Sequence, residues 1–576
     1  MTVTTAPTAR GAPISDSATR PEAHGAMTAP ASDRLAITLQ IVAALLWIPQ
    51  AGLLAFAVGN IAAGAPAVAA LWPAAGIFTL GVARATMERV GTLRAFATAR
   101  TRLSELRRQA IEAAAARAPL DAQRPSSGLV ASIVTEQAEA VLPYLARFQP
   151  LRMKVVVVPL VIVGFVFSLS WVAGLVLVLA APVIPVFMAL IGWHAKEASE
   201  RQLVRMGDMN AFLLDRLRGL ATIRAFDAVE RTARRLRSDA EDLRVSTMGV
   251  LRIAFLSSAV LELFAALGVA LVAVYVGFHF LGEITFGAWG RTLTLGEGLF
   301  ILLLAPAFFE PLRDLSSVWH DRASGVAGIE AMEKLATPAP AILGDLDHHG
   351  SASAQPALSV DVDALGIRHS GNAETTVDRL YLSVKAGERV AIMAPSGGGK
   401  STLLAALAGL IEPHAGAIRL GGEPLTRTTA ARLRTSIAWL GQPPHIFTGT
   451  LRGNIALGRS EVTPQDIERA LNVARIDHLA ARRGAAPIGE NGAGISGGEA
   501  LRLALARTAA GIRPGLILAD EPTAHLDDET ARDITESLLA LATGTTLIVA
   551  THDPVLAARM DRIIRISDGD MCEDSA

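Results

Sequence analysis

The run A-P-S-G-G-G-K-S-T at residues 394–402 constrains the fold more than any other stretch of this chain. Consecutive glycines leave backbone N–H groups free to surround phosphate oxygens at the start of a helix. Residues 387–393 predict a buried strand and residues 401–410 predict a helix, which is the setting of a phosphate-binding loop. The predicted phosphate-binding residues are Ser396, Gly397, Gly398, Gly399, Lys400, Ser401 and Thr402, with Lys400 reaching the β- and γ-phosphates and Ser401 holding Mg²⁺.

One letter of this motif is unusual. The first glycine of the pattern G-x-x-x-x-G-K-[ST] is replaced by Ala394, whose Cβ restricts the backbone more than glycine does. Taken alone, such a string could also be an ordinary turn rich in glycine and serine. We expect it to bind phosphate because matching motifs follow downstream.

The run L-I-L-A-D-E-P-T at residues 516–523 predicts a short apolar strand that ends in two carboxylates. Such a strand would deliver Asp520 to Mg²⁺ and Glu521 to the attacking water during hydrolysis of a phosphoanhydride. Taken alone, it could be a strand followed by a solvated acidic turn. Its position downstream of Lys400 favours a catalytic pair.

A second Gly-rich helix start, I-S-G-G-E at residues 495–499, lies between these motifs. Its residues Ser496, Gly497 and Gly498 would form another phosphate-binding helix N-terminus. One chain rarely directs two such sites at the same γ-phosphate. The pair therefore predicts nucleotide sites that are shared across a dimer.

Together with Gln442, residues 524–527 and His552, these motifs resemble the ATP-binding cassette of ABC transporters. The resemblance implies ATP and Mg²⁺ as cofactors. It also implies that Gln442 binds Mg²⁺ and couples nucleotide to the membrane part, that Asp527 touches the opposite subunit, and that His552 senses the γ-phosphate. Ser496 and Gly498 would complete the partner's nucleotide site.

Two positions depart from the pattern of that family. Glu499 replaces the glutamine of the Ser-Gly-Gly signature, and His369 stands where an aromatic residue often stacks on adenine. A histidine can stack, but less favourably than a tyrosine. We therefore expect the affinity for ATP to depend mainly on the phosphates.

The composition places the rest of the chain in a membrane. Hydrophobic residues make up 51% of the 576 residues, charged residues only 19%, and the mean hydropathy is +0.39. A net charge of −1 argues against a nucleic-acid partner, and the single cysteine, Cys572, cannot form an internal disulfide. Residues 1–33, rich in Ala, Thr, Pro and Ser, predict a disordered cytoplasmic tail.

Six apolar stretches approach the roughly 20 residues that a bilayer-spanning helix needs. They lie at residues 35–59, 66–86, 152–169, 171–193, 250–281 and 296–318. The predicted fold is a helical membrane domain at 34–335, similar to that of type I ABC exporters, a linker at 336–356, and an α/β P-loop cassette at 357–576.

The basic residues predict the orientation. The connection from Arg84 to Arg117 carries eight arginines, and that from Lys196 to Arg252 carries eleven arginines and a lysine. The positive-inside rule therefore places both termini, both long connections and the cassette in the cytoplasm. The family resemblance implies that the membrane is the bacterial inner membrane. Both connections predict helices that continue out of the bilayer, for example at 102–117, and residues 212–226 resemble the loop that docks onto the cassette in ABC exporters.

Residues 138–150, 181–193 and 308–323 closely resemble the CydD-type subunit of such exporters. The resemblance implies a heterodimer with a CydC-like half-transporter and export of glutathione, cysteine or haem in support of cytochrome bd assembly. Two alternatives are a homodimeric lipid or drug exporter and an ATP-regulated membrane scaffold for oxidase assembly.

A candidate substrate face lies in the last span. Arg313 and His320 are seven residues apart and would share one helix face, which Pro306 and Pro311 could bend around a cavity. Arg313 could hold a carboxylate, and His320 could ligate haem iron or donate a hydrogen bond. Alternatively, Arg313 pairs with Glu310, and His320 is an ordinary polar residue at the membrane interface.

Overall fold

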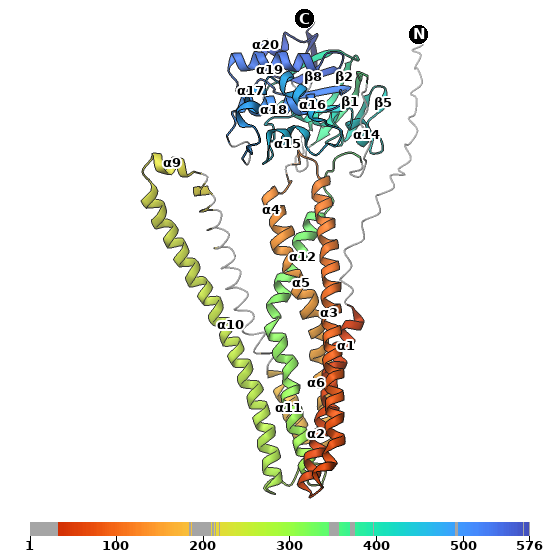
Figure 1. Cartoon of the computed structure of the whole chain (residues 1–576), viewed down its shortest axis with the longest axis vertical. Helices are drawn as coiled ribbons and strands as arrows, with labels where there is room; N and C mark the ends of the chain where they lie inside the picture. Colours follow the sequence, from red (N-terminus) through yellow and green to blue (C-terminus); the bar gives the residue numbers. More distant parts are fainter. Residues whose placement is uncertain are drawn as a thin grey trace, which may run out of the picture. The chain divides into compact units, whose positions relative to one another are not determined.

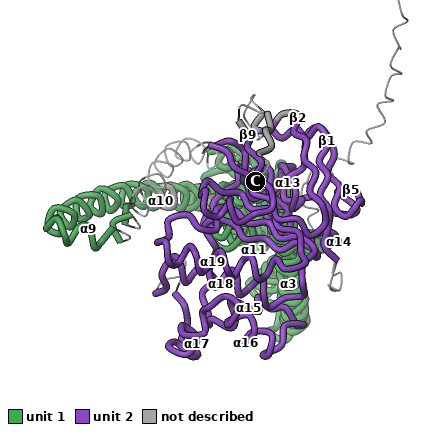
Figure 2. Tube along the Cα trace, turned by 90° about the horizontal axis from the view of Figure 1, so that it is seen from above, with its two compact units in different colours: residues 1–110, 130–335 green, residues 111–129, 336–576 purple. Residues whose placement is uncertain are grey.

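The computed structural model describes residues 33–121, 123–183, 219–344, 356–368, 375–395, 397–489, 494–567 and 570–574, with a few further positions between 186 and 217. The chain forms two compact units (Figure 2). Unit 1 contains residues 1–110 and 130–335, and unit 2 contains residues 111–129 and 336–576. We describe each unit separately.

Unit 1 is helical. Its longer helices are α1 (Arg34–Leu45), α2 (Trp47–Ala62), α3 (Leu71–Ala116), α6 (Gln149–Leu169), α7 (Trp171–Ala180), α10 (Val229–Phe280), α11 (Leu295–Ser317) and α12 (Trp319–Ala336). The shorter elements are η1 (Ala67–Ala70), α4 (Ser127–Ser132), η2 (Ile133–Gln137), α5 (Val141–Pro143), η3 (Tyr144–Phe148) and α9 (Leu220–Ala225). The last residues of α3 and the first three residues of α4 fall within unit 2.

Five helical segments are long and apolar enough to cross a membrane, and they confirm five of the six predicted spans. They are Arg34–Ala62, Ala67–Ala116, Ser127–Leu169, Ala259–Phe280 and Leu295–Ser317. For the span predicted at 171–193, the structure describes the apolar helix α7, and most of the residues after 183 lie outside the described part. That span stays a prediction.

Helices α3 and α10 extend beyond the thickness of a bilayer. With 46 and 52 residues, they are about 69 and 78 Å long at a rise of 1.5 Å per residue, whereas the hydrocarbon core is about 30 Å thick. The prediction that residues 102–117 continue a membrane helix is confirmed, since α3 ends only at Ala116. The arginine-rich ends of α3 and α10 therefore lie outside the hydrocarbon core of the bilayer.

Helix α11 is the central helix of unit 1 and packs against α2, α6 and α10 (Figure 1). Its buried side chains include Phe308 and Phe309, whose rings meet edge to face with centroids 4.9 Å apart. On α10, a Cβ placed on Gly268 would lie 2.4 Å from the Phe309 ring. A glycine is therefore required where these two helices approach each other.

Unit 2 contains a six-stranded sheet of order β10-β9-β3-β8-β7-β6 and a four-stranded antiparallel sheet of order β2-β1-β4-β5. The strands of the larger sheet are β3 (Arg389–Met393), β6 (Ile437–Leu440), β7 (Leu516–Asp520), β8 (Thr546–Ala550), β9 (Arg562–Ser567) and β10 (Asp570–Asp574), all parallel except β10. The smaller sheet consists of β1 (Val360–Arg368), β2 (Thr375–Val384), β4 (Ala415–Leu420) and β5 (Glu423–Pro424). Strands β7 and β8 are completely buried, as expected for a parallel sheet covered on both faces.

The helices of unit 2 are α13 (Lys400–Leu407), α14 (Ala430–Arg434), α15 (Leu451–Ala456), α16 (Pro464–Val473), α17 (Asp477–Arg483), α18 (Gly497–Ala509), α19 (Asp528–Leu541) and α20 (Pro554–Ala557). Helices α15 to α19 lie on one side of this unit, whereas β1, β2 and β5 lie on the other (Figure 2). A helical domain followed by an α/β domain with a P-loop is the fold that the sequence predicts.

Residues 111–129 belong to unit 2 through main-chain hydrogen bonds. The N–H of Ala118 donates to the carbonyl of Pro340, and the N–H of Ile342 donates to the carbonyl of Ala116, each over 2.8 Å. They form a short antiparallel bridge between Arg117 and Ala341. The end of α3 is thus attached to the first residues after α12, within the segment expected to be a linker.

Candidate functional site

The parallel strands β3, β7 and β8 bring the predicted nucleotide-binding motifs to one edge of the sheet. The N–H of Glu521 donates to the carbonyl of Ala550 over 2.8 Å, and the N–H of Thr551 donates to the carbonyl of Ile392 over 3.0 Å. The loop after β3, the acidic residues that end β7 and the histidine after β8 therefore lie together. In open α/β sheets, the carboxyl edge of the strands is where ligands bind.

The loop after β3 has the backbone conformation of a phosphate-binding loop. Gly397 and Gly399 adopt φ values of 81° and 80°, which only glycine adopts readily. Ala394 is not in this left-handed region, so the backbone accommodates its Cβ. A Cβ on Gly398 would lie 3.0 Å from that of Ala394, which leaves little room for a larger residue at either position. Ser396 lies outside the described residues.

Lys400 begins helix α13, and its side chain lies inside the loop. Its Nζ donates to the carbonyl of Ala394 over 2.7 Å and lies 3.4 Å from Oε1 of Glu521. Only 9% of this side chain is exposed. A buried ammonium group that is held by loop carbonyls is positioned to bind phosphate oxygens entering the same loop.

Asp520 supplies the unpaired oxygen that a metal ion would need. The residue is buried at the end of β7, and its Oδ1 has no hydrogen-bond partner in the described part of the chain. Burial raises the pKa of Asp520, an effect that the hydrogen bond from Ser401 and the charge of Lys400 oppose and that of Glu521 reinforces. Because Mg²⁺ prefers oxygen ligands, the Asp520 carboxylate and the Ser401 hydroxyl fit this ion.

Glu521 is oriented by His552. Oε2 of Glu521 lies 2.7 Å from Nδ1 of His552 and accepts a second hydrogen bond, of 3.3 Å, from the His552 backbone N–H. The Glu521 side chain is only 12% exposed, while that of His552 is 69% exposed. A carboxylate with a fixed orientation beside a phosphate-binding loop can accept a proton from an attacking water.

Gln442 follows β6, whose neighbour in the sheet is β7, so it lies at the same edge as Asp520. Its side chain is exposed. His369, the residue expected near adenine, lies outside the described residues.

The Ser-Gly-Gly motif begins helix α18 with a capping box. Oγ of Ser496 accepts a hydrogen bond of 3.2 Å from the Glu499 N–H, and Oε2 of Glu499 accepts one of 2.7 Å from the Ser496 N–H. Arg482 also donates to Glu499 over 2.7 Å. Burial raises the pKa of Glu499, but the hydrogen bonds from Ser496 and Arg482 outweigh it, and the net direction is downward. The unusual glutamate therefore has a structural role in this helix start.

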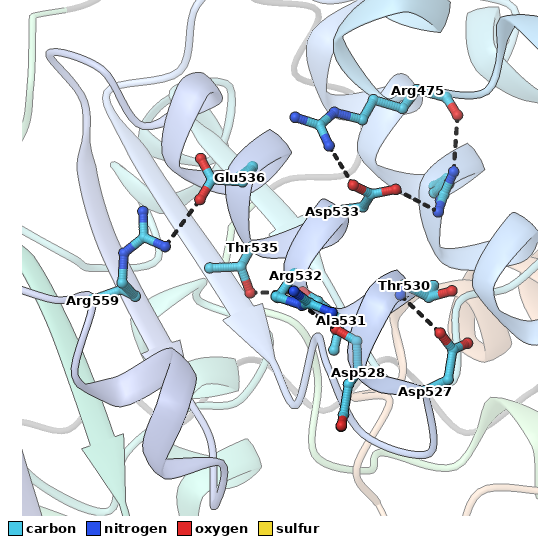
Figure 3. A network of polar contacts seen from close by, with 11 residues as sticks. Arg475, Asp527, Asp528, Thr530, Ala531, Arg532, Asp533, Thr535, Glu536 and Arg559 are labelled. Atoms are coloured by element: carbon cyan, nitrogen blue, oxygen red, sulfur yellow. Dashed lines mark hydrogen bonds and ion pairs between the residues drawn. The ribbon is translucent and has the colours of Figure 1, made fainter.

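Helix α19 lies directly against this helix start. A Cβ on Gly498 would lie 2.9 Å from Cγ2 of Thr530. Asp527 caps α19, since its Oδ1 accepts a hydrogen bond of 2.9 Å from the Thr530 N–H (Figure 3). Outside its own helix backbone and chain neighbours, no atom of the described residues lies within 4 Å of a Cβ added to Gly497.

A partly exposed ion-pair network joins α18 to α19. Asp533 of α19 pairs with Arg475 (Figure 3) and with Arg502 of α18, the latter over 3.1 Å. Arg502 also donates to the Arg475 carbonyl over 3.1 Å, and only 16% of its side chain is exposed. The two helices that carry Ser496 and Asp527 are therefore held together.

In the membrane-spanning unit, Arg313 has a different partner from the one considered. Its Nη1 lies 3.1 and 3.2 Å from the two carboxylate oxygens of Glu262 on α10, so the alternative pairing with Glu310 is wrong. The two partners are 51 residues apart in the sequence, which local spacing could not reveal.

Arg313 and His320 do not belong to one continuous helix. Helix α11 ends at Ser317, and α12 begins at Trp319. The predicted shared face assumed an unbroken helix, and no glycine or proline marks the interruption at Val318. The side chain of His320 lies outside the described part of the structure.

A cavity of about 300 Å³ lies beside Arg313. It is lined by Trp47, Arg84, Leu302, Leu303, Pro306, Ala307, Glu310 and Arg313. Sequence reasoning missed Trp47 and Arg84 as candidate site residues. Arg84 could have been found, because it is a charged residue inside the span predicted at 66–86, and charges within membrane helices are usually functional or paired.

Comparison with known proteins identifies the family. The ABC transporter family matches residues 377–524, and the ABC transporter transmembrane region matches residues 35–300. The "Glutathione/L-cysteine transport system ATP-binding/permease protein CydD" of Haemophilus influenzae is 35% identical over 78% of this chain and 76% of its own length. The protein with the same name from Escherichia coli is 36% identical over 81% and 79%, and "Transport ATP-binding protein AarD" of Providencia stuartii is 34% identical over 94% and 92%.

A solved bacterial Atm1-family ABC exporter with ATP bound has the same fold, with a TM-score of 0.68 at 23% identity over 94% of this chain and 96% of that one. The chain is thus a multi-pass membrane protein with an ATP-binding, ATP-hydrolysing domain. It belongs to the ABC transporter family, in the group of CydD- and CydC-type ATP-binding/permease proteins.

Proposed function

We propose that this chain is one half of a heterodimeric ABC exporter that moves glutathione and cysteine across the bacterial inner membrane in support of cytochrome bd assembly. The observation that carries this proposal is the 35–36% identity, over 76–81% of both chains, to transporters named for these two thiols. A CydC-like half-transporter is the proposed partner, since a relative named CydC is also 32% identical. A homodimer is the alternative that the experiment below distinguishes.

The proposed catalytic centre is the carboxyl edge of β3, β7 and β8. Mg·ATP would supply the phosphoanhydride bond whose hydrolysis drives transport. Asp520, Ser401 and Gln442 would hold the Mg²⁺, and Lys400 with the loop N–H groups of 396–402 would bind the phosphates. Glu521 would accept a proton from the attacking water while His552 keeps its carboxylate oriented, as their 2.7 Å contact supports.

The partner's nucleotide would be completed by the starts of α18 and α19. Ser496, Gly497 and Gly498 form a helix N-terminus, where N–H groups and the helix dipole favour an anion. Asp527 begins the adjacent helix. We assign the contact with adenine to His369 by its place after β1.

We propose that both termini and the cassette are cytoplasmic. Most of the arginines of α3 and α10 lie in the parts of these helices that extend beyond the bilayer. Loops and helix ends rich in basic residues stay on the cytoplasmic side of the membrane. Residues 212–226 are then on the cytoplasmic side as well, which is where docking onto a cassette would take place.

The test uses inverted membrane vesicles from bacteria that produce this chain together with its CydC-like partner. We expect ATP-dependent uptake of radiolabelled glutathione and L-cysteine, and loss of uptake when Glu521 and the equivalent carboxylate of the partner are changed to amides. Vesicles that contain this chain alone should be inactive, and transport activity in them would favour a homodimer.

Haem is offered separately and its uptake is followed by absorption, because haem uptake without thiol uptake would overturn the assignment of cargo. ATP turnover without uptake of any of the three would favour the assembly scaffold.

A further inference from the structure

Two charged side chains that line the cavity beside Arg313, one positive and one negative, form no salt bridge with any residue that the structure describes. Arg313 itself is neutralised by both oxygens of Glu262. Among the described residues, Arg84 of α3 and Glu310 of α11 form no ion pair, although both line the cavity. Charges within membrane helices are costly unless they are paired or used. This pair therefore calls for a ligand with complementary charges.

Arg84 is held in place by an aromatic ring. Its Cζ lies 5.5 Å from the centre of the Trp47 ring, within the range of a cation–π contact. The indole Nε1 of Trp47 donates a hydrogen bond of 3.2 Å to the carbonyl of Leu303, which fixes the ring against α11. A ring contact orients a guanidinium but leaves its N–H donors available, so Arg84 can still bind a carboxylate.

Two prolines supply further acceptors on the same helix. Pro306 and Pro311 have no N–H, so the carbonyls of Leu302 and Ala307 lack the donor that a helix normally provides four residues later. Leu302 and Ala307 both line the cavity. Carbonyl oxygens without a helical partner, close to a glutamate, form a suitable surface for an ammonium group, which carries three donors.

We infer that this cavity binds a zwitterionic α-amino acid group, with the carboxylate on Arg84 and the ammonium on Glu310. The inference deepens the proposed function and rests on it, because cysteine and the γ-glutamyl end of glutathione both carry this group. Haem carries two carboxylates and no ammonium, so Glu310 would oppose its binding. The cavity volume of about 300 Å³ is at the lower end of that of small-molecule sites and fits a compact ligand.

The test measures ligand binding to the purified complex of this chain and its partner half in lipid nanodiscs, by calorimetry. The probes are L-cysteine, cysteamine, which lacks the carboxylate, and N-acetyl-L-cysteine, which lacks the ammonium. We expect wild-type protein to bind L-cysteine at least about tenfold more tightly than either analogue, because each analogue loses a charge-assisted contact.

The variants separate the two contacts. Arg84→Gln should weaken L-cysteine about tenfold or more and leave cysteamine unchanged, and Arg84→Lys should recover part of the loss. Glu310→Gln should weaken L-cysteine and leave N-acetyl-L-cysteine unchanged. Arg89→Gln and Glu88→Gln, at exposed positions of α3, the helix that carries Arg84, are charge-matched controls with expected wild-type binding. Unchanged melting temperature and basal ATP turnover verify that each variant is folded.

Two outcomes overturn the inference: wild-type protein that binds L-cysteine no better than its analogues, or variants at 84 and 310 that bind L-cysteine like wild type. The proposed function fails separately. If L-cysteine binds as described but no thiol enters the vesicles with ATP, then the site is present and the transport assignment is wrong.

Discussion

Oε2 of Glu521 lies 2.7 Å from Nδ1 of His552, so the carboxylate that follows β7 and the imidazole that follows β8 form one unit. The other oxygen of the same carboxylate faces Lys400 at 3.4 Å. Both contacts act on the orientation of Glu521. Its chemical role can therefore be tested by a change that keeps the shape of this side chain and removes its ability to accept a proton.

Glu521→Gln should lower ATP turnover by about 10²- to 10⁴-fold, the usual contribution of a general base, while ATP still binds. Phosphate release and nucleotide binding are measured on the complex with the partner's equivalent residue also changed to its amide. Glu529→Gln, an exposed acid in the first turn of α19, is the control with expected wild-type turnover. Turnover that persists in the Glu521 variant would assign proton transfer to another group.

Asp520→Asn should stabilise the protein in the absence of Mg²⁺, because burial raises the pKa of Asp520 above its ordinary value of 3.8. The folded form then holds its proton more tightly than the unfolded form, so wild-type stability falls as pH rises from 3.8 to the raised value and stays level above it. The difference in melting temperature between Asp520→Asn and wild type should grow across that pH range.

Wild type should also gain stability from Mg·ATP, whereas Asp520→Asn should not. A variant that gains as much as wild type would exclude Asp520 as a ligand.

Ser496→Ala should destabilise unit 2 by about 1 kcal/mol, because α18 loses its N-cap. Ser496→Thr should keep most of that stability. Glu499→Gln should cost less than Ser496→Ala, since glutamine can also complete a capping box and only the contact with Arg482 is lost. Thermal melting of the three variants provides the ranking, and a larger cost for Glu499→Gln would mean that the ion pair dominates this helix start.

Asp533→Asn should destabilise the protein by about 1–3 kcal/mol, because it leaves the largely buried Arg502 without its carboxylate. Glu536→Gln is a matched control on the same helix. Glu536 pairs with Arg559 (Figure 3), and both side chains are about half exposed, so its loss should cost about 0–1 kcal/mol. Equal melting temperatures of the two variants would show that the network does not hold α18 to α19.

Local patterns predicted the nucleotide-binding edge well. The strand, glycine loop and helix at 387–410 are adjacent in sequence, so the local motif indicates their geometry. The structure places Lys400, Asp520, Glu521 and His552 together as expected. The apolar spans could also be predicted from the sequence, because a bilayer imposes a minimum length on each spanning helix.

The contacts of the membrane helices were much less predictable. The pairing of Arg313 with Glu262 and the cavity beside Trp47 and Arg84 depend on how four separate helices pack, which no local period encodes. The end of α11 at Ser317 also lacks a sequence signal. At Glu499, the family pattern marked a departure, but only the structure shows that this side chain completes a capping box with Ser496 and accepts a hydrogen bond from Arg482.

The bridge between Arg117 and Ala341 attaches the end of α3 to the segment that follows α12. Main-chain hydrogen bonds attach the C-terminal end of this 46-residue helix to unit 2. Its N-terminal end, at Leu71, lies about 69 Å away along the helix axis. A displacement at the Ala116 end can therefore be transmitted along one continuous helix to Leu71, with no loop in between to absorb it.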